Sequence, residues 1–278
     1  MATTIGDLRQ FRIAFLYQLR SYLRTWRFIG LLIFVLLIAS GLLAVQLHRG
    51  VDAVTANNPT SSDYLATYLS TLEDAVIVVA AFLGGDALAV DLSGGPGYLM
   101  LTQPVRRGTL LAGRYVAAVV TGTAIGLVYY LFAAVAVQYF YGNIPSSILL
   151  SLGAALLFLL AVLAVAFFFS SFFRNATVSI IASILILLLG FPILTSVGDL
   201  LGAEPWYSLD YGAQTITTVF QSSFKHESSM HIGGARGVGI TLYSYSPYPW
   251  EGAVIMAVYL GVFLVLSYVL YRYKEVKG

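Results

Sequence analysis

Long apolar runs dominate the chain and set its expected architecture. The hydrocarbon layer of a bilayer is about 30 Å thick, so a helix needs roughly 20 consecutive apolar residues to cross it. Runs that meet this requirement occur at 28–47, 115–139, 148–169, 176–197 and 252–271. The pattern therefore predicts at least five transmembrane helices.

A sixth run, at 70–90, is apolar but is interrupted by Glu73, Asp74 and Asp86. It is either a span with polar ends or a helix on the membrane surface, and the basic residues favour a span. With six spans, one side of the membrane receives Arg9, Arg12, Arg20, Arg24, Arg27, Arg106, Arg107, Arg114, Arg174, Arg272, Lys274 and Lys277, and the other side receives Arg49, Lys225 and Arg236. Basic residues concentrate on the cytoplasmic side. We therefore expect six spans, with both termini in the cytoplasm.

The segment 6–27, before the first span, has the pattern of an amphipathic helix. Apolar residues recur at steps of three and four, and the arginines fall together on an adjacent flank. This pattern suits a helix lying in the cytoplasmic headgroup layer, with its guanidinium groups at lipid phosphates. The alternative is a helix packed only on protein. The apolar stripe comprises Leu8, Phe11, Phe15, Leu19, Tyr22 and Trp26.

The connections between the expected spans differ greatly in length. The first outer loop, 48–69, is polar and has a turn signal at Asn57-Asn58-Pro59. The longest connection, 198–251, lies on the outer side and is rich in Tyr, Ser and Gly. Its first half, 200–224, is compatible with short helices, whereas 226–249 is typical of a loop or a hairpin.

Composition agrees with this picture and excludes several function classes. Of the 278 residues, 59% are hydrophobic and 10% are charged, and the mean hydropathy is +0.84, as expected for a polytopic membrane protein. The absence of cysteine excludes disulfides and thiolate metal sites. A phosphate-binding P-loop needs Gly-Lys-Ser or Gly-Lys-Thr, but Lys225, Lys274 and Lys277 are followed by His, Glu and Gly. The chain therefore has no ATPase motif of its own, and we expect no catalytic residue and no cofactor in it.

The segment 91–114, between the second and third expected spans, is the main polar interruption on the cytoplasmic side. Gly94 and Gly95 break the incoming helix, 98–102 can form one helical turn, Pro104 ends that turn, and two arginines follow. A short helix held between breakers can transmit a push from a neighbouring protein into two spans at once.

This segment resembles the corresponding stretch of ABC-2-type permeases, the membrane subunits of ATP-binding-cassette exporters. The shared features are an acidic residue at the end of a span, paired glycines, an apolar turn, Pro-Val-Arg-Arg, and then Gly113-Arg114. The layout is also similar, with an amphipathic N-terminal helix, six spans and the longest outer loop before the last span.

The resemblance implies an all-α, type V exporter-like fold in which 1–278 form a single transmembrane domain in the plasma membrane. It also implies dimerisation with a second permease subunit and docking of two ATPase subunits, which carry ATP and Mg²⁺. No nucleic-acid partner is expected, and the other partner is the lipid bilayer. The implied ATPase-coupling residues are Gly94, Gly95, Leu99, Leu101, Pro104, Arg106 and Arg107, with Arg174 and Asn175 in the turn between spans four and five as a second contact.

Ionisable groups within spans are costly and are therefore functional candidates. Asp86 lies near the inner end of span two and either has a structural role, such as pairing with an arginine, or takes part in the translocation path or gate. Glu73 and Asp74 are near the outer edge of the same span and are either a hydrated helix end or part of that path. These alternatives remain open from the sequence.

A second polar group lies in the outer loop, where His226, Glu227, Met230 and His231 occur close together. These side-chain types suit a copper or zinc ion. Glycine-flanked histidines are also common in solvated loops without a metal. Both interpretations stay open, with His226 and His231 as the metal candidates.

The function predicted from these observations is export driven by a separate ATPase. The alternatives are a channel, a non-transporting membrane scaffold, or an ABC permease that serves maturation of a copper enzyme. Spans three to six contain almost no charge, which disfavours an ion channel. The sequence leaves open the substrate, the direction of transport, and the choice between homodimer and heterodimer.

Overall fold

The computed structural model describes residues 7–89, 107–221, 224–232 and 240–273. Within these ranges, six helical segments are long and apolar enough to cross a membrane, which confirms the prediction of a mostly helical membrane protein with six spans. They are α2 (Trp26–Arg49), α4 (Ser61–Leu69) continued by α5 (Leu72–Gly84), α8 (Arg107–Tyr141), α9 (Ser147–Phe172), α10 (Ala176–Leu185) continued through the π-helical η1 (Ile186–Gly190) into α11 (Phe191–Leu201), and α14 (Pro249–Tyr273).

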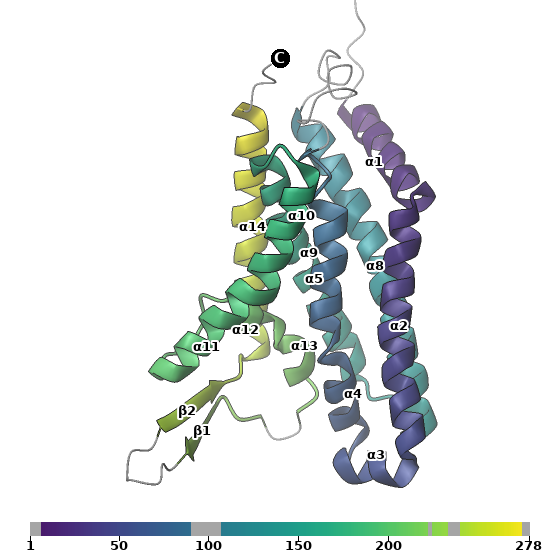
Figure 1. Ribbon diagram of the computed structural model, residues 1–278, viewed down its shortest axis with the longest axis vertical. Coiled ribbons are helices and arrows are strands. Elements are labelled where there is room, and N and C mark those ends of the chain that lie inside the picture. The colour runs from purple at the N-terminus through teal and green to yellow at the C-terminus, as the bar shows by residue number, and fades with distance from the viewer. Residues whose placement is uncertain (1–6, 90–106, 222–223, 233–239, 274–278) are drawn as a thin grey trace, which may run out of the picture.

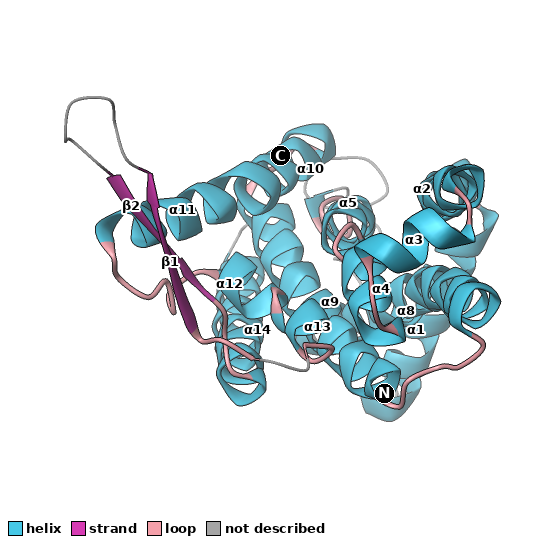
Figure 2. Cartoon of the chain, turned by 90° about the horizontal axis from the view of Figure 1, so that it is seen from below, coloured by secondary structure: helices cyan, strands magenta, loops and turns pink. Residues whose placement is uncertain are grey.

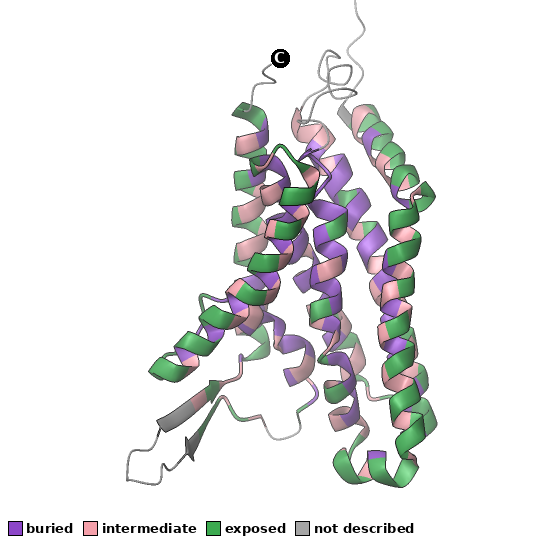
Figure 3. Ribbon diagram, viewed as in Figure 1, coloured by how far each residue is buried: buried purple, intermediate pink, exposed green. Residues whose placement is uncertain are grey.

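The bundle is built around α9, which packs against α5, α8, α10 and α14 (Figures 1 and 2). Ala161, Ala164 and Ala166 of α9 are fully buried, and such small side chains let helix backbones approach closely in a membrane. Buried residues concentrate on α5, α8 and α9, whereas α2 and α14 are largely exposed (Figure 3). The core of the protein therefore lies between α5, α8 and α9.

The amphipathic helix expected at 6–27 is α1 (Asp7–Arg24), and it packs along α8. Gly113 of α8 makes this approach possible, because a Cβ atom there would lie 2.8 Å from the Cβ of Ala14. Tyr22 is buried, whereas Leu8 and Trp26, at the two ends of the predicted stripe, are exposed. The helix thus packs on protein through residues such as Ala14 and Tyr22 and leaves its arginines exposed.

The second span lies earlier in the chain than expected. It covers Ser61–Gly84 rather than 70–90, because part of the predicted polar loop forms α4. The hydroxyl of Thr60 accepts a hydrogen bond from the Asp63 N–H, at 3.1 Å, and so caps the start of α4. Its apolar face is buried, including Tyr64 and Tyr68, and the Tyr68 hydroxyl donates to the Ala39 carbonyl at 2.6 Å. A preceding short helix, α3 (Val51–Asn57), follows the end of α2.

The long connection between α11 and α14 has the two parts that its composition suggested. Two short helices, α12 (Leu209–Ala213) and α13 (Thr215–Thr218), are buried against the bundle, and the Ser151 hydroxyl of α9 donates to the Ile216 carbonyl at 2.7 Å. An antiparallel hairpin then follows, of β1 (Glu227–Ile232) and β2 (Ile240–Tyr245), with Glu227 paired with Tyr245. The hairpin lies at the end of the bundle opposite α1 (Figure 1). We call these two ends the hairpin end and the α1 end.

Candidate functional site

The segment that follows α5 at the α1 end is packed tightly between other spans. The helix ends at Gly84, and the Gly85 N–H still donates to the Ala81 carbonyl at 2.8 Å. A Cβ atom on Gly84 would lie 2.8 Å from the Cβ of Ala166, and one on Gly85 would lie 2.9 Å from a side-chain carbon of Ile180. Glycines at these two positions therefore let the end of α5 lie between α9 and α10.

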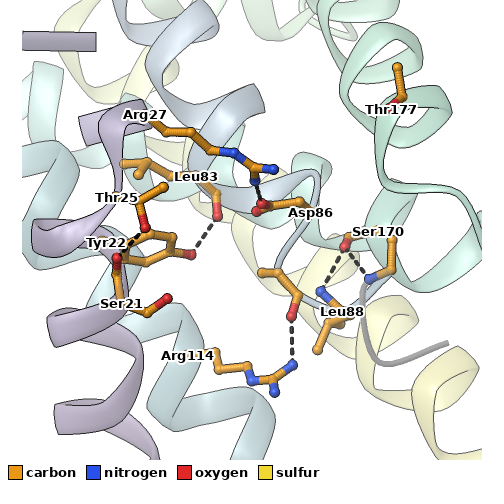
Figure 4. A network of polar contacts seen from close by, with 12 residues as sticks. Ser21, Tyr22, Thr25, Arg27, Leu83, Asp86, Leu88, Arg114, Ser170 and Thr177 are labelled. Carbon is orange, nitrogen blue, oxygen red and sulfur yellow. Dashed lines mark hydrogen bonds and ion pairs between the residues drawn. The ribbon is translucent and has the colours of Figure 1, made fainter. Parts of the chain in front are cut away.

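Two arginines from different helices bind this segment. Arg27, in the first turn of α2, forms an ion pair with the carboxylate of Asp86 (Figure 4). Arg114 of α8 is buried and donates from Nη1 to the Ala87 carbonyl at 2.6 Å. Arg114 and Asp86 are buried, so the protein contacts replace the solvation that these two groups have lost, whereas Arg27 stays largely exposed.

Two hydroxyl groups complete the contacts. The Tyr22 hydroxyl of α1 donates to the Leu83 carbonyl at 2.5 Å. The Ser170 hydroxyl of α9 accepts from the backbone N–H groups of Leu88 and Ala89, at 2.8 and 3.0 Å. Residues 83–89 together with their partners Tyr22, Arg27, Arg114 and Ser170 form what we call the α5-end cluster (Figure 4).

The α5-end cluster connects four helices, α1, α2, α8 and α9, to one short piece of chain. This piece precedes 90–106, and Arg107, the first residue of α8, follows that segment. There, Nη1 of Arg107 donates to the carbonyls of Tyr271 and Arg272 at the end of α14, at 3.1 and 2.9 Å. The described residues on either side of 90–106 are therefore bonded to membrane-spanning helices.

The ATPase-coupling residues predicted from the sequence fall into two groups. Gly94, Gly95, Leu99, Leu101, Pro104 and Arg106 lie outside the described residues. Arg107 binds the end of α14, as described above. The Asn175 side chain caps α10 by accepting from the N–H groups of Thr177 and Val178, at 2.9 and 3.4 Å, and its neighbour Arg174 is exposed.

The three acidic candidates of span two differ in their surroundings. Asp86 lies just beyond the end of α5 and pairs with Arg27, which is the structural alternative considered for it. Glu73 and Asp74 lie in the first turn of α5, which is about halfway along the segment Ser61–Gly84 rather than at its outer edge. The carboxyl of Glu73 lies beside that of Asp210 in α12.

The histidine candidates also differ in their surroundings. His226 lies just before β1 at the hairpin end, where its Nε2 is 3.6 Å from Oε2 of Glu204. His231 belongs to β1, but its side chain lies outside the described part. The residues that approach His226 are thus Glu204 and Glu251, which are distant in sequence, and the expected cluster of sequence neighbours did not include them.

Sequence reasoning missed most members of the α5-end cluster. The sequence pattern placed Tyr22 only in an apolar stripe, and it assigned no role to Ser170, which follows the expected span 148–169. The available signals were the pair Gly84-Gly85 directly before Asp86 and the dipeptide Gly113-Arg114. These signals mark a close approach of helices, but they do not say which helices meet.

The comparison with protein families agrees with this architecture. A model for ABC-2 family transporter proteins matches residues 17–276, which covers all six spans, the α5-end cluster and the hairpin. A search of curated protein sequences returned no match. The chain is therefore a multi-pass membrane protein that belongs to the ABC-2 transporter family.

Proposed function

We propose that this chain is the permease subunit of an ABC exporter, in which separate ATPase subunits drive movement of the substrate. The observation that carries this proposal is the α5-end cluster, because it ties α1, α2, α8 and α9 to the chain that enters 90–106. In this proposal the ATPase contacts 90–106, and Leu99 and Leu101 provide apolar contact with it.

The α1 end is the proposed docking face and lies in the cytoplasm. Exposed arginines of α1, including Arg9, Arg12 and Arg20, are placed to bind anionic lipid headgroups around it. The exposed turn at Arg174 and Asn175 supplies the second ATPase contact. With six spans, both termini then lie on this side of the plasma membrane, as the concentration of basic residues suggests.

The proposed coupling step follows from the contacts at the two ends of 90–106. Movement of this segment pulls on Leu88 and Ala89, which are bonded to Ser170 of α9, and on Arg107, which is bonded to the end of α14. Because packed helices move as rigid bodies, a displacement of a few ångströms there repacks several spans together. Two ATPase subunits acting on two permease subunits would open a path between the permease subunits to one side of the membrane and then to the other.

Glu73 and Asp74 are the proposed polar elements of that path. They lie halfway along span two, where charged groups are costly and are usually retained for function. Asp86 is not part of the path in this proposal, because its carboxylate is engaged by Arg27.

Co-purification of the ATPase tests the proposal. The double variant Leu99→Asp/Leu101→Asp should lose the ATPase subunit while keeping the thermal stability of the permease. Leu201→Asp, an exposed position at the hairpin end, is the matched control and should retain the ATPase. Normal co-purification and normal ATP turnover of the double variant would contradict the proposal that Leu99 and Leu101 contact the ATPase.

The same experiment separates the rival functions. A channel or a scaffold should purify without any ATPase subunit and should show no ATP-dependent activity in lipid nanodiscs. A permease of an exporter should bind two ATPase subunits per permease dimer.

A further inference from the structure

We propose that Glu204, His226 and Glu251 form a binding site for a divalent cation of the zinc type at the hairpin end. Glu204 follows α11, His226 precedes β1, and Glu251 lies in the first turn of α14. Their candidate ligand atoms all lie within 4.8 Å of one another, and all three side chains are partly buried. The site is independent of the proposed transport function.

The separation between His226 and Glu204 fits two ligands of one ion better than a direct contact. Nε2 of His226 and Oε2 of Glu204 are 3.6 Å apart, which is too long for a good hydrogen bond. Zinc bonds of about 2.1 Å at tetrahedral angles place two ligand atoms about 3.4 Å apart. These two atoms therefore need only a small movement to bind the same ion.

The imidazole of His226 is held in the orientation that a metal ligand requires. Its Nδ1 lies 3.0 Å from the Ser246 carbonyl, which accepts a hydrogen bond when Nδ1 carries the proton. Its ring also stacks on Tyr248, with centroids 4.8 Å apart. When Nδ1 carries the proton in this way, Nε2 has a lone pair that can bind a metal ion, and this nitrogen lies 3.6 Å from Oε2 of Glu204.

The two carboxylates are oriented by groups outside the site. The Tyr211 hydroxyl, in α12, donates to Oε1 of Glu204 at 2.7 Å and leaves Oε2 facing His226. The Tyr248 N–H donates to Oε2 of Glu251 at 2.9 Å, at the start of α14. Hydrogen bonds of this kind to the ligating groups are the usual supports of protein metal sites.

The donor set points to zinc. One imidazole and two carboxylates suit zinc in tetrahedral coordination, with a water molecule in the fourth position. The bound ion would link three segments that are far apart in the sequence, namely the chain after α11, the hairpin and the last span. Its structural effect would be to hold the outer loop onto the start of α14.

Zinc titration of the purified full-length chain in lipid nanodiscs tests this site. Isothermal titration with zinc alone should show one ion bound per chain in the wild type. His226→Ala should abolish this binding, and His48→Ala, an exposed histidine at the end of α2, should leave it unchanged. Tyr211→Phe removes only the hydroxyl that supports Glu204, so zinc affinity should fall by about 10- to 100-fold.

A second pair of variants keeps the test valid if His226→Ala does not fold. Glu204→Gln and Glu251→Gln retain an oxygen that can accept the same hydrogen bonds from Tyr211 and Tyr248, but they lose the negative charge. Each should weaken zinc binding at least as much as Tyr211→Phe while circular dichroism and thermal unfolding remain normal. No zinc binding by the wild type at micromolar concentration, or equal binding by the wild type and folded site variants, would overturn the proposal.

Discussion

Arg27 and Asp86 form an ion pair that joins the start of α2 to the chain just beyond α5. The two side chains differ in exposure, since 56% of the Arg27 side chain is accessible to solvent but only 12% of that of Asp86. The aspartate therefore depends on its protein partner, whereas the arginine can be solvated without it. A change at Arg27 therefore deprives Asp86 of the partner on which it depends.

Replacing Arg27 with alanine should leave the carboxylate of Asp86 poorly solvated and reduce the free energy of unfolding. The exposure of Arg27 lets water screen the pair, so we expect a loss of about 1 kcal/mol. Arg27→Lys should lose less stability than Arg27→Ala, because a cation remains beside Asp86. Arg24→Ala, an exposed neighbour on α1, is the control, and unfolding in an SDS titration is the measurement. Equal effects of Arg24→Ala and Arg27→Ala would contradict a specific pair.

Ser170→Ala should destabilise the protein more than an ordinary buried serine substitution. It leaves the N–H groups of Leu88 and Ala89 without their acceptor, and an unsatisfied buried donor costs about 1–3 kcal/mol. Ser267→Ala is the matched control, since the Ser267 hydroxyl is also buried but donates only to the Phe263 carbonyl of its own helix.

Thermal unfolding measures this loss of stability, and hydrogen exchange locates it. The amides of Leu88 and Ala89 should exchange faster in Ser170→Ala than in the wild type, with little change elsewhere in α9. Unchanged protection of these two amides would show that Ser170 does not hold the end of the α5-end cluster.

Tyr22 should make stability depend on alkaline pH. Burial, and next the negative charge of Asp86, raise the pKa of the Tyr22 hydroxyl. The unfolded chain loses this proton near pH 10, whereas the folded chain retains it. The contribution of Tyr22 to the free energy of unfolding is therefore fully present below about pH 10 and is lost as the pH rises further.

The variant Tyr22→Phe isolates this effect. It should be less stable than the wild type at pH 7, by about 1 kcal/mol, because it lacks the hydrogen bond to the Leu83 carbonyl. The difference between the two proteins should narrow between pH 9 and 11. Tyr17→Phe, an exposed tyrosine on the same helix, should show neither effect, and a constant gap for Tyr22→Phe across this range would refute the prediction.

Gly113→Ala should weaken the packing of α1 on α8. The added methyl group would lie 2.8 Å from the Ala14 Cβ and 3.1 Å from the backbone nitrogen of Phe15, so no side-chain rotation relieves the clash. We expect a loss of about 1–3 kcal/mol. Gly126→Ala in the same helix meets nothing within 4 Å, and it should be neutral or stabilising by about 0.5–1 kcal/mol. The thermal unfolding temperatures of Gly113→Ala and Gly126→Ala, each compared with the wild type, test these two expectations.

The sequence by itself determined the class of the protein and the number of its spans. In a bilayer every backbone polar group must be satisfied within the protein, so a run of about 20 apolar residues has a helix as its stable form. The hairpin was among the alternatives predicted for 226–249, and the amphipathic helix before the first span was predicted from its periodicity. The start of span two was misplaced because α4 buries Tyr64 and Tyr68 on one face while its other face is polar.

The tertiary structure alone decided which residues meet. Asp86 binds Arg27, Ala87 binds Arg114 and Leu88 binds Ser170, and these pairs are separated by dozens of residues. Likewise, His226 faces Glu204 and Glu251 rather than its sequence neighbours. The physical reason is that apolar runs of similar composition can pack in many arrangements. Partners are selected only by close-packed glycines, such as Gly84 and Gly113, and by buried polar groups that must be satisfied, and both depend on the assembled bundle.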